Sequence, residues 1–327
     1  MNLLDNPERT VVGRLAPSPT GGLHLGHART FLVAWLAARQ AGGRMILRIE
    51  DLDASRVRPG AREGAVADLR WLGFDWDHGP DVGGPAGPYV QSERTLFYDR
   101  ALDQLKAGEW VYPCTCTRAE VARAASAPHA DEEGPVYPGT CASRRAADAL
   151  ALTGRPFAWR SRTPAETIVW NDLFQGRIDV SPDRLGGDFI VARHAVGHAY
   201  QLAVVVDDHA MGVTQVIRGL DLIPSTPRQI LLYRRLGWSV PDFGHVPLAV
   251  DGEGRRLAKR SESLKLETLR AAGADPRRLI GLLAQSCGWS SVLEPSRPGD
   301  WIGRVDPAAI PGEPWVVPHD LMTRLII

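Results

Sequence analysis

Lysine is nearly absent from this chain of 327 residues, which has only Lys106, Lys259 and Lys265 and uses arginine at every other basic position except histidine. Acidic and basic residues number 38 each, so the formal net charge is zero. A neutral chain lacks the broad basic surface of a non-specific nucleic-acid binder, although this count leaves room for a local basic groove. We interpret the scarcity as a coding bias towards arginine, against which a retained lysine is a candidate for function.

Long apolar runs are missing too. The N-terminus, MNLLDNPERT, has no apolar segment of the kind found in a secretory signal peptide. No uncharged stretch is long enough to cross a bilayer. Hydrophobic residues make up 44% and charged residues 23%, which is typical of a soluble globular protein. The sequence therefore predicts a cytoplasmic protein without a membrane partner, and we expect a monomer.

Cysteine is also scarce, and three of its four positions cluster: Cys114, Cys116, Cys141 and Cys287. This arrangement favours a cytosolic metal site over a disulfide framework. In the pattern CxC followed by YxxxC, the three clustered thiolates and the phenolate of Tyr137 could complete a tetrahedral zinc shell. His129 is an alternative fourth ligand, and inert buried cysteines are the competing interpretation. Cys287 is interpreted as an ordinary core residue.

The N-terminal part of the chain alternates strand and helix. Residues 10–16 and 44–50 have the apolar pattern of buried strands, and residues 25–41 between them carry apolar side chains at helical spacing. Gly42 and Gly43 end that helix. The order predicts a parallel sheet with a right-handed crossover. Further helices are predicted at residues 63–72 and 95–107.

Residues 111–186 interrupt this pattern, because they are rich in Ala, Pro and Gly and weakly periodic. We interpret them as an insertion between two halves of an α/β domain, residues 1–110 and 187–240. Three apolar runs in the second half suit central strands covered on both faces: residues 188–193, 199–206 and 213–218.

The remaining part, residues 241–327, is predicted to be a charged loop followed by a short, mainly helical region. A helix at residues 227–236, capped by Thr226, and a strand at residues 245–250 precede the loop DGEGRRLAKRSES. Helices are predicted at residues 264–272 and 276–287. The tail after Ser296, rich in Pro and Trp, carries no assignment.

The segment PSPTGGLHLGH places His24 and His27 around Gly26, at the start of a helix that follows a strand. A helix N-terminus attracts anions, two imidazoles there can donate to a phosphate oxygen, and Gly26 lets an adenine ring approach the backbone. The motif alone is equally compatible with ordinary capping histidines. Downstream, RRLAKR puts Lys259 on a loop that can close over a triphosphate and stabilise charge on pyrophosphate, although alone it would suit a solvated basic loop.

Together these motifs resemble the HIGH and KMSKS signatures of class I aminoacyl-tRNA synthetases. The segments RLAPSPTGGLHLGHA, RIEDLD and AYQLAVVVDDHAMGVTQVIRGLDLI look like the glutamyl group of that family, from about residue 11 to about residue 265. The loop departs from the family pattern, since Arg256 replaces the first lysine and Ala258 the serine. Lys259 keeps the position of the catalytic lysine, and Arg256 keeps the charge without lysine's compact head. The resemblance implies a Rossmann-like catalytic domain, split by the zinc-containing insertion.

The resemblance also implies a set of site residues. Catalysis is assigned to His24, His27 and Lys259, which with Gly26 bind ATP and its Mg²⁺. Glutamate has two carboxylates and one ammonium, so its pocket needs cationic forks and an acid. Arg14 and Arg218 can serve as the forks, Glu50 can hold the ammonium, and Tyr200 can close one wall. The family's glutamate positions correspond to Arg14, Leu15, Ala16, Pro17, Ser18, Glu50, Tyr200 and Arg218. Asp207, Asp208, His209 and Asp221 are expected nearby, without specific roles.

About sixty residues follow the KMSKS-like loop, too few for the helical anticodon-binding region of a glutamyl-tRNA synthetase. The CxC and YxxxC pattern resembles the glutamyl-queuosine tRNA(Asp) synthetase branch, in which tyrosine is a zinc ligand. That branch implies formation of glutamyl-adenylate from ATP and L-glutamate without tRNA, then transfer of glutamate to the queuosine base in the anticodon of tRNA(Asp). A truncated glutamyl-tRNA synthetase that charges a tRNA 3′ end and a catalytically silent tRNA-binding paralogue are the alternatives.

Overall fold

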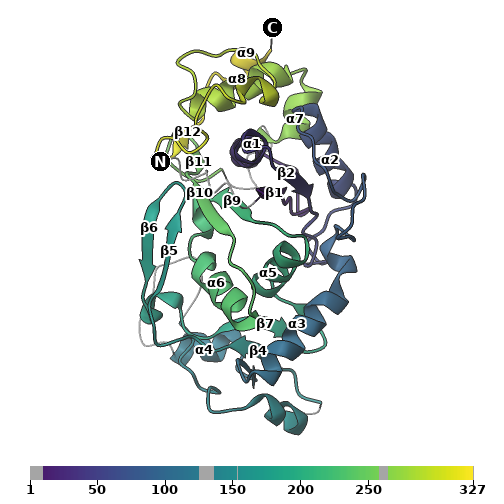
Figure 1. Cartoon of the computed structure of the whole chain (residues 1–327), viewed down its shortest axis with the longest axis vertical. Helices are drawn as coiled ribbons and strands as arrows, with labels where there is room; N and C mark the ends of the chain where they lie inside the picture. Colours follow the sequence, from purple (N-terminus) through teal and green to yellow (C-terminus); the bar gives the residue numbers. More distant parts are fainter. Residues whose placement is uncertain (1–9, 125–135, 153, 258–263, 327) are drawn as a thin grey trace.

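The computed structural model describes residues 10–124, 136–152, 154–257 and 264–326 (Figure 1). Strand β1 (Val12–Leu15) pairs in parallel with β2 (Arg44–Leu47), and helix α1 (Leu25–Gln40) connects them. This confirms the predicted strand–helix–strand unit. The helix forms because its apolar positions lie against the strands, and it ends where Gly42 adopts a left-handed φ of 64°.

A second parallel pair, β9 (Gln215–Gly219) and β10 (Asp242–Val246), lies beside the first. The Thr214 backbone N–H donates to the Val12 carbonyl at 2.9 Å, and the Arg14 guanidinium donates to the Ile217 carbonyl at 3.0 Å. These bonds bring the carboxyl ends of β1 and β9 to the same edge. Ligands bind at such an edge in open α/β sheets.

Strands β3 and β4 of the predicted insertion form an antiparallel sheet with two strands that follow it, in the order β3, β4, β7, β8, and β5 and β6 form a separate hairpin. Figure 1 shows β4, β7 and α4 at the lower end of the molecule and the hairpin along one side. The bounds of these elements are β3 (Val111–Cys114), α4 (Arg118–Ala124), η2 (Ala146–Leu152), β4 (Ala158–Ser161), β5 (Ile168–Asp172), β6 (Gly176–Val180), η3 (Pro182–Leu185), β7 (Phe189–Arg193) and β8 (Gly197–His198).

The predicted strand at residues 188–193 is confirmed as β7, an inner strand of its sheet, but that sheet is not the one formed by the parallel pairs. Strand β7 pairs antiparallel with β4 and β8. An apolar run reports that a strand is covered, and it says nothing about which strand lies beside it. The predicted domain bounds stay a prediction. Strand β7, which they place in the second half of the α/β domain, shares a sheet with β3 and β4 of the insertion.

The predicted strand at residues 199–206 is also wrong, because the segment forms helix α5 (Tyr200–Ala210). Its side chains from Leu202 to Asp208 are all buried, and the helix packs between α3 (Thr95–Ala107) and α6 (Ser225–Leu236). A helix buried on every side has no polar stripe, so its apolar run cannot be told from a strand by periodicity. Burial here overrides the strand preference of its three valines.

The C-terminal part covers the outer side of α1, at the end of the molecule opposite the insertion (Figure 1). The buried Arg29 guanidinium of α1 donates to the Pro247 carbonyl at 2.6 Å and to the Ser286 hydroxyl at 3.0 Å, which ties both segments to α1. The remaining elements are α2 (Ala61–Trp71), η1 (Gln91–Glu93), η4 (Leu220–Leu222), β11 (Ala249–Val250), α7 (Leu266–Ala271), α8 (Pro276–Ser286), η6 (Pro298–Trp301), β12 (Trp315–Val316) and α9 (Leu321–Leu325).

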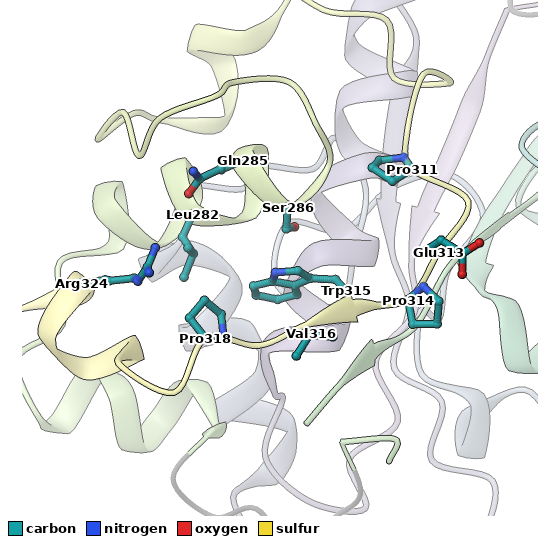
Figure 2. Close-up of a pocket in the computed structure, with 10 residues that line it drawn as sticks. All are labelled: Leu282, Gln285, Ser286, Pro311, Glu313, Pro314, Trp315, Val316, Pro318 and Arg324. Atoms are coloured by element: carbon teal, nitrogen blue, oxygen red, sulfur yellow. The ribbon is translucent and has the colours of Figure 1, made fainter. Parts of the chain in front are cut away.

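The tail that the sequence left unassigned packs on α8 and adds β12 to β11. The predicted strand at residues 245–250 is in fact divided, since its first part belongs to β10 and its last part is β11. A hollow of about 360 Å³ lies here, lined by residues of α8 and of the tail. Figure 2 shows the Trp315 ring with Leu282 and Ser286 of α8 on one side and Pro318 on the other. In the parts of the chain that the structure describes, no helix is long and apolar enough to span a bilayer.

Candidate active site

A cavity of about 700 Å³ opens where the carboxyl ends of β1 and β9 meet the N-terminus of α1. Its lining includes most residues predicted to bind nucleotide or glutamate: Arg14, Ala16, Pro17, Ser18, His24, Gly26, His27, Glu50, Tyr200 and Arg218. Among the described residues of that predicted set, only Leu15 lies elsewhere, fully buried in the core. Lys259 falls outside the described residues, as does the alternative zinc ligand His129.

The two histidines of the HIGH-like motif close the first turn of α1. His24 is the N-cap, and its Nδ1 accepts the Gly26 N–H at 3.1 Å, while Nδ1 of His27 accepts the His24 N–H at 3.3 Å. Their rings stack with centroids 3.8 Å apart. Burial, followed by the nearby Arg256 charge, lowers the pKa of His24 to about 4. With its Nδ1 occupied as an acceptor, each neutral ring carries its proton on Nε2.

The KMSKS-like loop enters the same cavity through Arg256 and Leu257, which both contribute to the lining. Arg256 forms an ion pair with Asp221, a residue just after β9 to which the sequence assigned no role. Lys265, which the sequence did not assign either, lines the cavity from the far end of the same loop and is 9% exposed. Positive side chains therefore border the His24 end of the cavity on both sides of residues 258–263.

Glu50 lies at the other end of the cavity, held by a buried arginine. Arg48 donates to the Glu50 carboxylate at 2.9 Å and to Asp208 at 2.6 Å. Burial raises the pKa of Glu50, and the charges of Arg48 and Arg14 oppose that shift. A ligand ammonium placed beside Glu50 would further favour its ionised form. Glu50 is therefore an acid in a fixed position, with a place on the cavity wall where it can bind a cation.

Two aspartates of the VDDH segment of α5, Asp207 and Asp208, lie beside Arg48, the arginine that holds Glu50. Asp207 is fully buried and accepts hydrogen bonds from Arg94 at 2.5 Å, from Gln91 at 2.8 Å and from Tyr98 at 2.9 Å. Because removing charges from water is costly, buried ion pairs of this kind contribute little net folding stability, and their main effect here is to fix the orientation of the side chains. His209, by contrast, stacks on Trp238 with ring centroids 4.0 Å apart.

Arg218 is 4% exposed, and its guanidinium is held on several sides. Its Nε donates to His245 at 3.1 Å, Nη1 to Gln229 at 2.8 Å, and Nη2 to the Thr226 hydroxyl at 2.8 Å. The prediction that Thr226 caps α6 is wrong, because the helix begins at Ser225 and the Thr226 hydroxyl serves Arg218 instead. Burial lowers the pKa of Arg218, and Tyr200 opposes that shift.

The three clustered cysteines and Tyr137 converge in the small core of the insertion. The Sγ atoms of Cys116 and Cys141 are 3.7 Å apart, and the Tyr137 hydroxyl is 3.3 Å from the Cys114 Sγ. Tetrahedral zinc with bonds of about 2.3 Å to sulfur and about 2.0 Å to oxygen gives edges of about 3.8 and 3.5 Å, close to these values. Burial and the neighbouring thiols raise the pKa of Cys116 to about 11, and a bound cation would favour the thiolate instead. The donor set therefore fits one zinc ion.

A sequence profile of tRNA synthetases class I (E and Q), catalytic domain, matches residues 10–294. The chain belongs to this family. A glutamyl-Q tRNA(Asp) synthetase of Symbiobacterium thermophilum is 53% identical over 96% of this chain and 98% of the relative. One from Nitratidesulfovibrio vulgaris is 50% identical, over 96% and 97%. A glutamate-tRNA synthetase of Elizabethkingia anophelis, 30% identical, superimposes with a TM-score of 0.84 over 96% of this chain and 69% of that chain.

This class I synthetase fold brings residues to its cavity, or beneath it, that the sequence did not single out: Thr30, Arg48, Arg58, Asp172, His245 and Lys265. A sequence signal existed for Arg48, because it lies two residues before Glu50 in RIEDLD and so shares a face with it in extended chain. Asp172 had no such signal, since it comes from the weakly patterned insertion.

Proposed function

We propose that this chain is a glutamyl-Q tRNA(Asp) synthetase, which activates L-glutamate with ATP and transfers it to the queuosine base in the anticodon of tRNA(Asp). One observation carries the proposal: relatives of that name match this chain almost end to end, at 53% and 50% identity. The longer glutamate-tRNA synthetase of Elizabethkingia anophelis is matched over only 69% of its length. The cavity supports an adenylating enzyme, because imidazole donors and an acid–arginine set share one space.

In the mechanism that follows, an oxygen of the glutamate α-carboxylate attacks the α-phosphorus of ATP in line. A new O–P bond forms, the bond to the bridging oxygen breaks, and pyrophosphate leaves with Mg²⁺. Positioning and charge stabilisation carry the rate. The Nε2–H groups of His24 and His27 donate to the oxygens of the α-phosphate as negative charge develops there. Lys259 stabilises the departing pyrophosphate, with Arg256 and Lys265 at the borders of its loop.

The glutamate site in this proposal lies between β1 and β9. Arg14 and Arg218 receive the carboxylates, Glu50 receives the ammonium, and Tyr200 forms a wall. Ala16, Pro17 and Ser18 line the same space, while Leu15 before them packs in the core. Both arginines are at most 5% exposed, so their charges act in a site with little screening by water.

We expect adenylation to proceed without RNA. Purified protein with glutamate, ATP and Mg²⁺ should exchange labelled pyrophosphate into ATP. The reason is that the described residues proposed to bind ATP and glutamate line one cavity, with no RNA needed to bring them together. Exchange that appears only after tRNA is added would contradict the branch assignment. Protein without glutamate is the control.

The acceptor is tested separately with two samples of tRNA(Asp), one carrying queuosine and one carrying the unmodified base. Labelled glutamate should attach only to the queuosine-containing sample and should survive removal of the tRNA 3′ terminal nucleotide. Label lost with the 3′ nucleotide would favour a glutamyl-tRNA synthetase that charges the 3′ end.

We also propose one structural zinc ion per chain, held by Cys114, Cys116, Tyr137 and Cys141. When bound, zinc would join strand β3 to the segment around Cys141 and so fix the core of the insertion. Elemental analysis of protein purified without added metal should find about one zinc per chain. Tyr137→Phe should release zinc to a chelator faster while retaining it initially, because three thiolates remain. Folded protein without zinc would exclude the site.

A further inference from the structure

His245, on strand β10, connects the insertion hairpin to the proposed glutamate pocket. It is fully buried between Asp172, the last residue of β5, and Arg218 on β9. Its Nδ1 lies 2.5 Å from the Asp172 Oδ2, and its Nε2 lies 3.1 Å from the Arg218 Nε. A line of side chains therefore joins two residues 73 positions apart and continues to the guanidinium.

The direction of these hydrogen bonds is fixed by chemistry. A guanidinium has only donors, so in its bond with Arg218 the His245 Nε2 accepts and Nδ1 carries the proton. The Thr226 hydroxyl, 3.1 Å from the same Nε2, can donate to it as well. Nδ1 then donates to the Asp172 carboxylate. Burial lowers the pKa of His245, which agrees with a neutral ring, and hydrogen bonding to His245 helps hold the pKa of Asp172 down against its own burial.

Asp172 is itself held firmly by the backbone. Its Oδ1 accepts the N–H groups of His245 at 3.0 Å and of Phe174 and Gln175 at 3.1 Å each. The Phe174 ring packs so closely on Gly244 that a Cβ there would lie 2.7 Å from it. The hairpin therefore contacts β10 at both Gly244 and His245, and with Oδ1 held by three N–H groups the Asp172 Oδ2 faces the His245 Nδ1.

We propose that Asp172 and His245 are positioning residues that set the orientation of the Arg218 guanidinium and thereby the selection of glutamate over glutamine. This rests on the proposed function, because it assigns Arg218 to a substrate carboxylate. Neither residue lines the described part of the cavity, so both act through Arg218. The hairpin of the insertion would then serve amino-acid recognition as well as supporting its own sheet.

The variant Asp172→Asn tests the proposal because it should change the tautomer of His245. Three backbone N–H groups require an oxygen at Oδ1, so the amide nitrogen takes the place of Oδ2 and donates towards Nδ1. The ring must then move its proton to Nε2, where it faces the Arg218 Nε–H, and two donors repel each other. We expect KM for glutamate to rise roughly ten- to hundredfold in pyrophosphate exchange, with KM for ATP unchanged and the glutamate-to-glutamine ratio reduced.

His245→Gln supplies the rescue. The glutamine Oε1 can occupy the position of Nε2 and accept from Arg218, and an amide needs no Asp172 carboxylate to fix a tautomer. His245→Gln should therefore stay within a few-fold of wild type, and adding Asp172→Asn to it should change little. His245→Leu, which has no acceptor, should behave like Asp172→Asn. Even if Asp172→Asn does not fold, the two His245 variants test whether Arg218 needs an acceptor at this position. A His245→Leu enzyme with the same KM for glutamate as His245→Gln would contradict the proposal.

Asp179→Asn is the matched control, because Asp179 lies on β6 of the same hairpin with its side chain 51% exposed. Nitrogen NMR of histidine-labelled protein should show the Nδ1–H tautomer for His245 in wild type and Nε2–H in Asp172→Asn. A folded Asp172→Asn protein with unchanged KM for glutamate, or an Nε2–H wild type, would overturn the proposal. Wild type without glutamate-dependent exchange would instead overturn the proposed function, while the spectra still decide the hydrogen-bond order.

Discussion

Arg218→Gln should lower kcat/KM for glutamate by at least roughly a hundredfold in pyrophosphate exchange and should narrow the preference over glutamine. A substrate carboxylate would lose its charged partner, and Gln229, Thr226 and His245 would lose the donor that they now share. Leaving such buried groups unsatisfied costs about 1–3 kcal/mol each, so thermal unfolding must be measured beside activity. Arg218→Lys keeps a charge without the fork and should recover only part of the rate.

The control for this variant is Arg193→Gln. Arg193 is exposed at the end of β7, outside the described lining of the cavity, so its loss should leave both the rate and the amino-acid preference unchanged. If folded Arg218→Gln kept full glutamate preference, the selecting cation would be Arg14. Arg14 lines the same cavity, and its guanidinium already donates to the Ile217 carbonyl.

Lys259→Ala should lower the rate of adenylation far more than it weakens ATP binding. In the sequence the residue is two positions from Leu257, which lines the cavity. A lysine there would meet charge that appears on pyrophosphate only in the transition state, and such contacts raise turnover rather than ground-state affinity. Loss of one such donor costs about 2–4 kcal/mol, or roughly 30- to 1000-fold in kcat.

Lys106→Ala is the matched lysine control, because Lys106 lies on α3 and pairs with Asp103. Its exchange rate should equal that of wild type, with kcat and KM for ATP measured in the same series. A Lys259→Ala enzyme with wild-type kcat would show that the lysine takes no part in adenylation.

The sequence by itself determined the features whose signals are local. The strand–helix–strand unit of β1, α1 and β2 follows from residue periodicity, and the two histidines around Gly26 mark the start of α1. The cysteine spacing already suggested a metal shell, because its ligands come from two short segments. The resemblance to class I synthetases likewise rested on contiguous motifs, and the family match confirms it.

Only the tertiary structure decided which covered segment is a helix and which strands pair. The α5 segment is apolar all round because neighbours enclose it, and β7 joins β4 rather than the parallel pairs. The same holds for the links from Arg48 to Asp208, 160 positions apart, and from Asp172 to His245. Local periodicity reports whether a side chain is covered. It carries no information about which distant partner covers it, because that choice depends on packing across the whole chain.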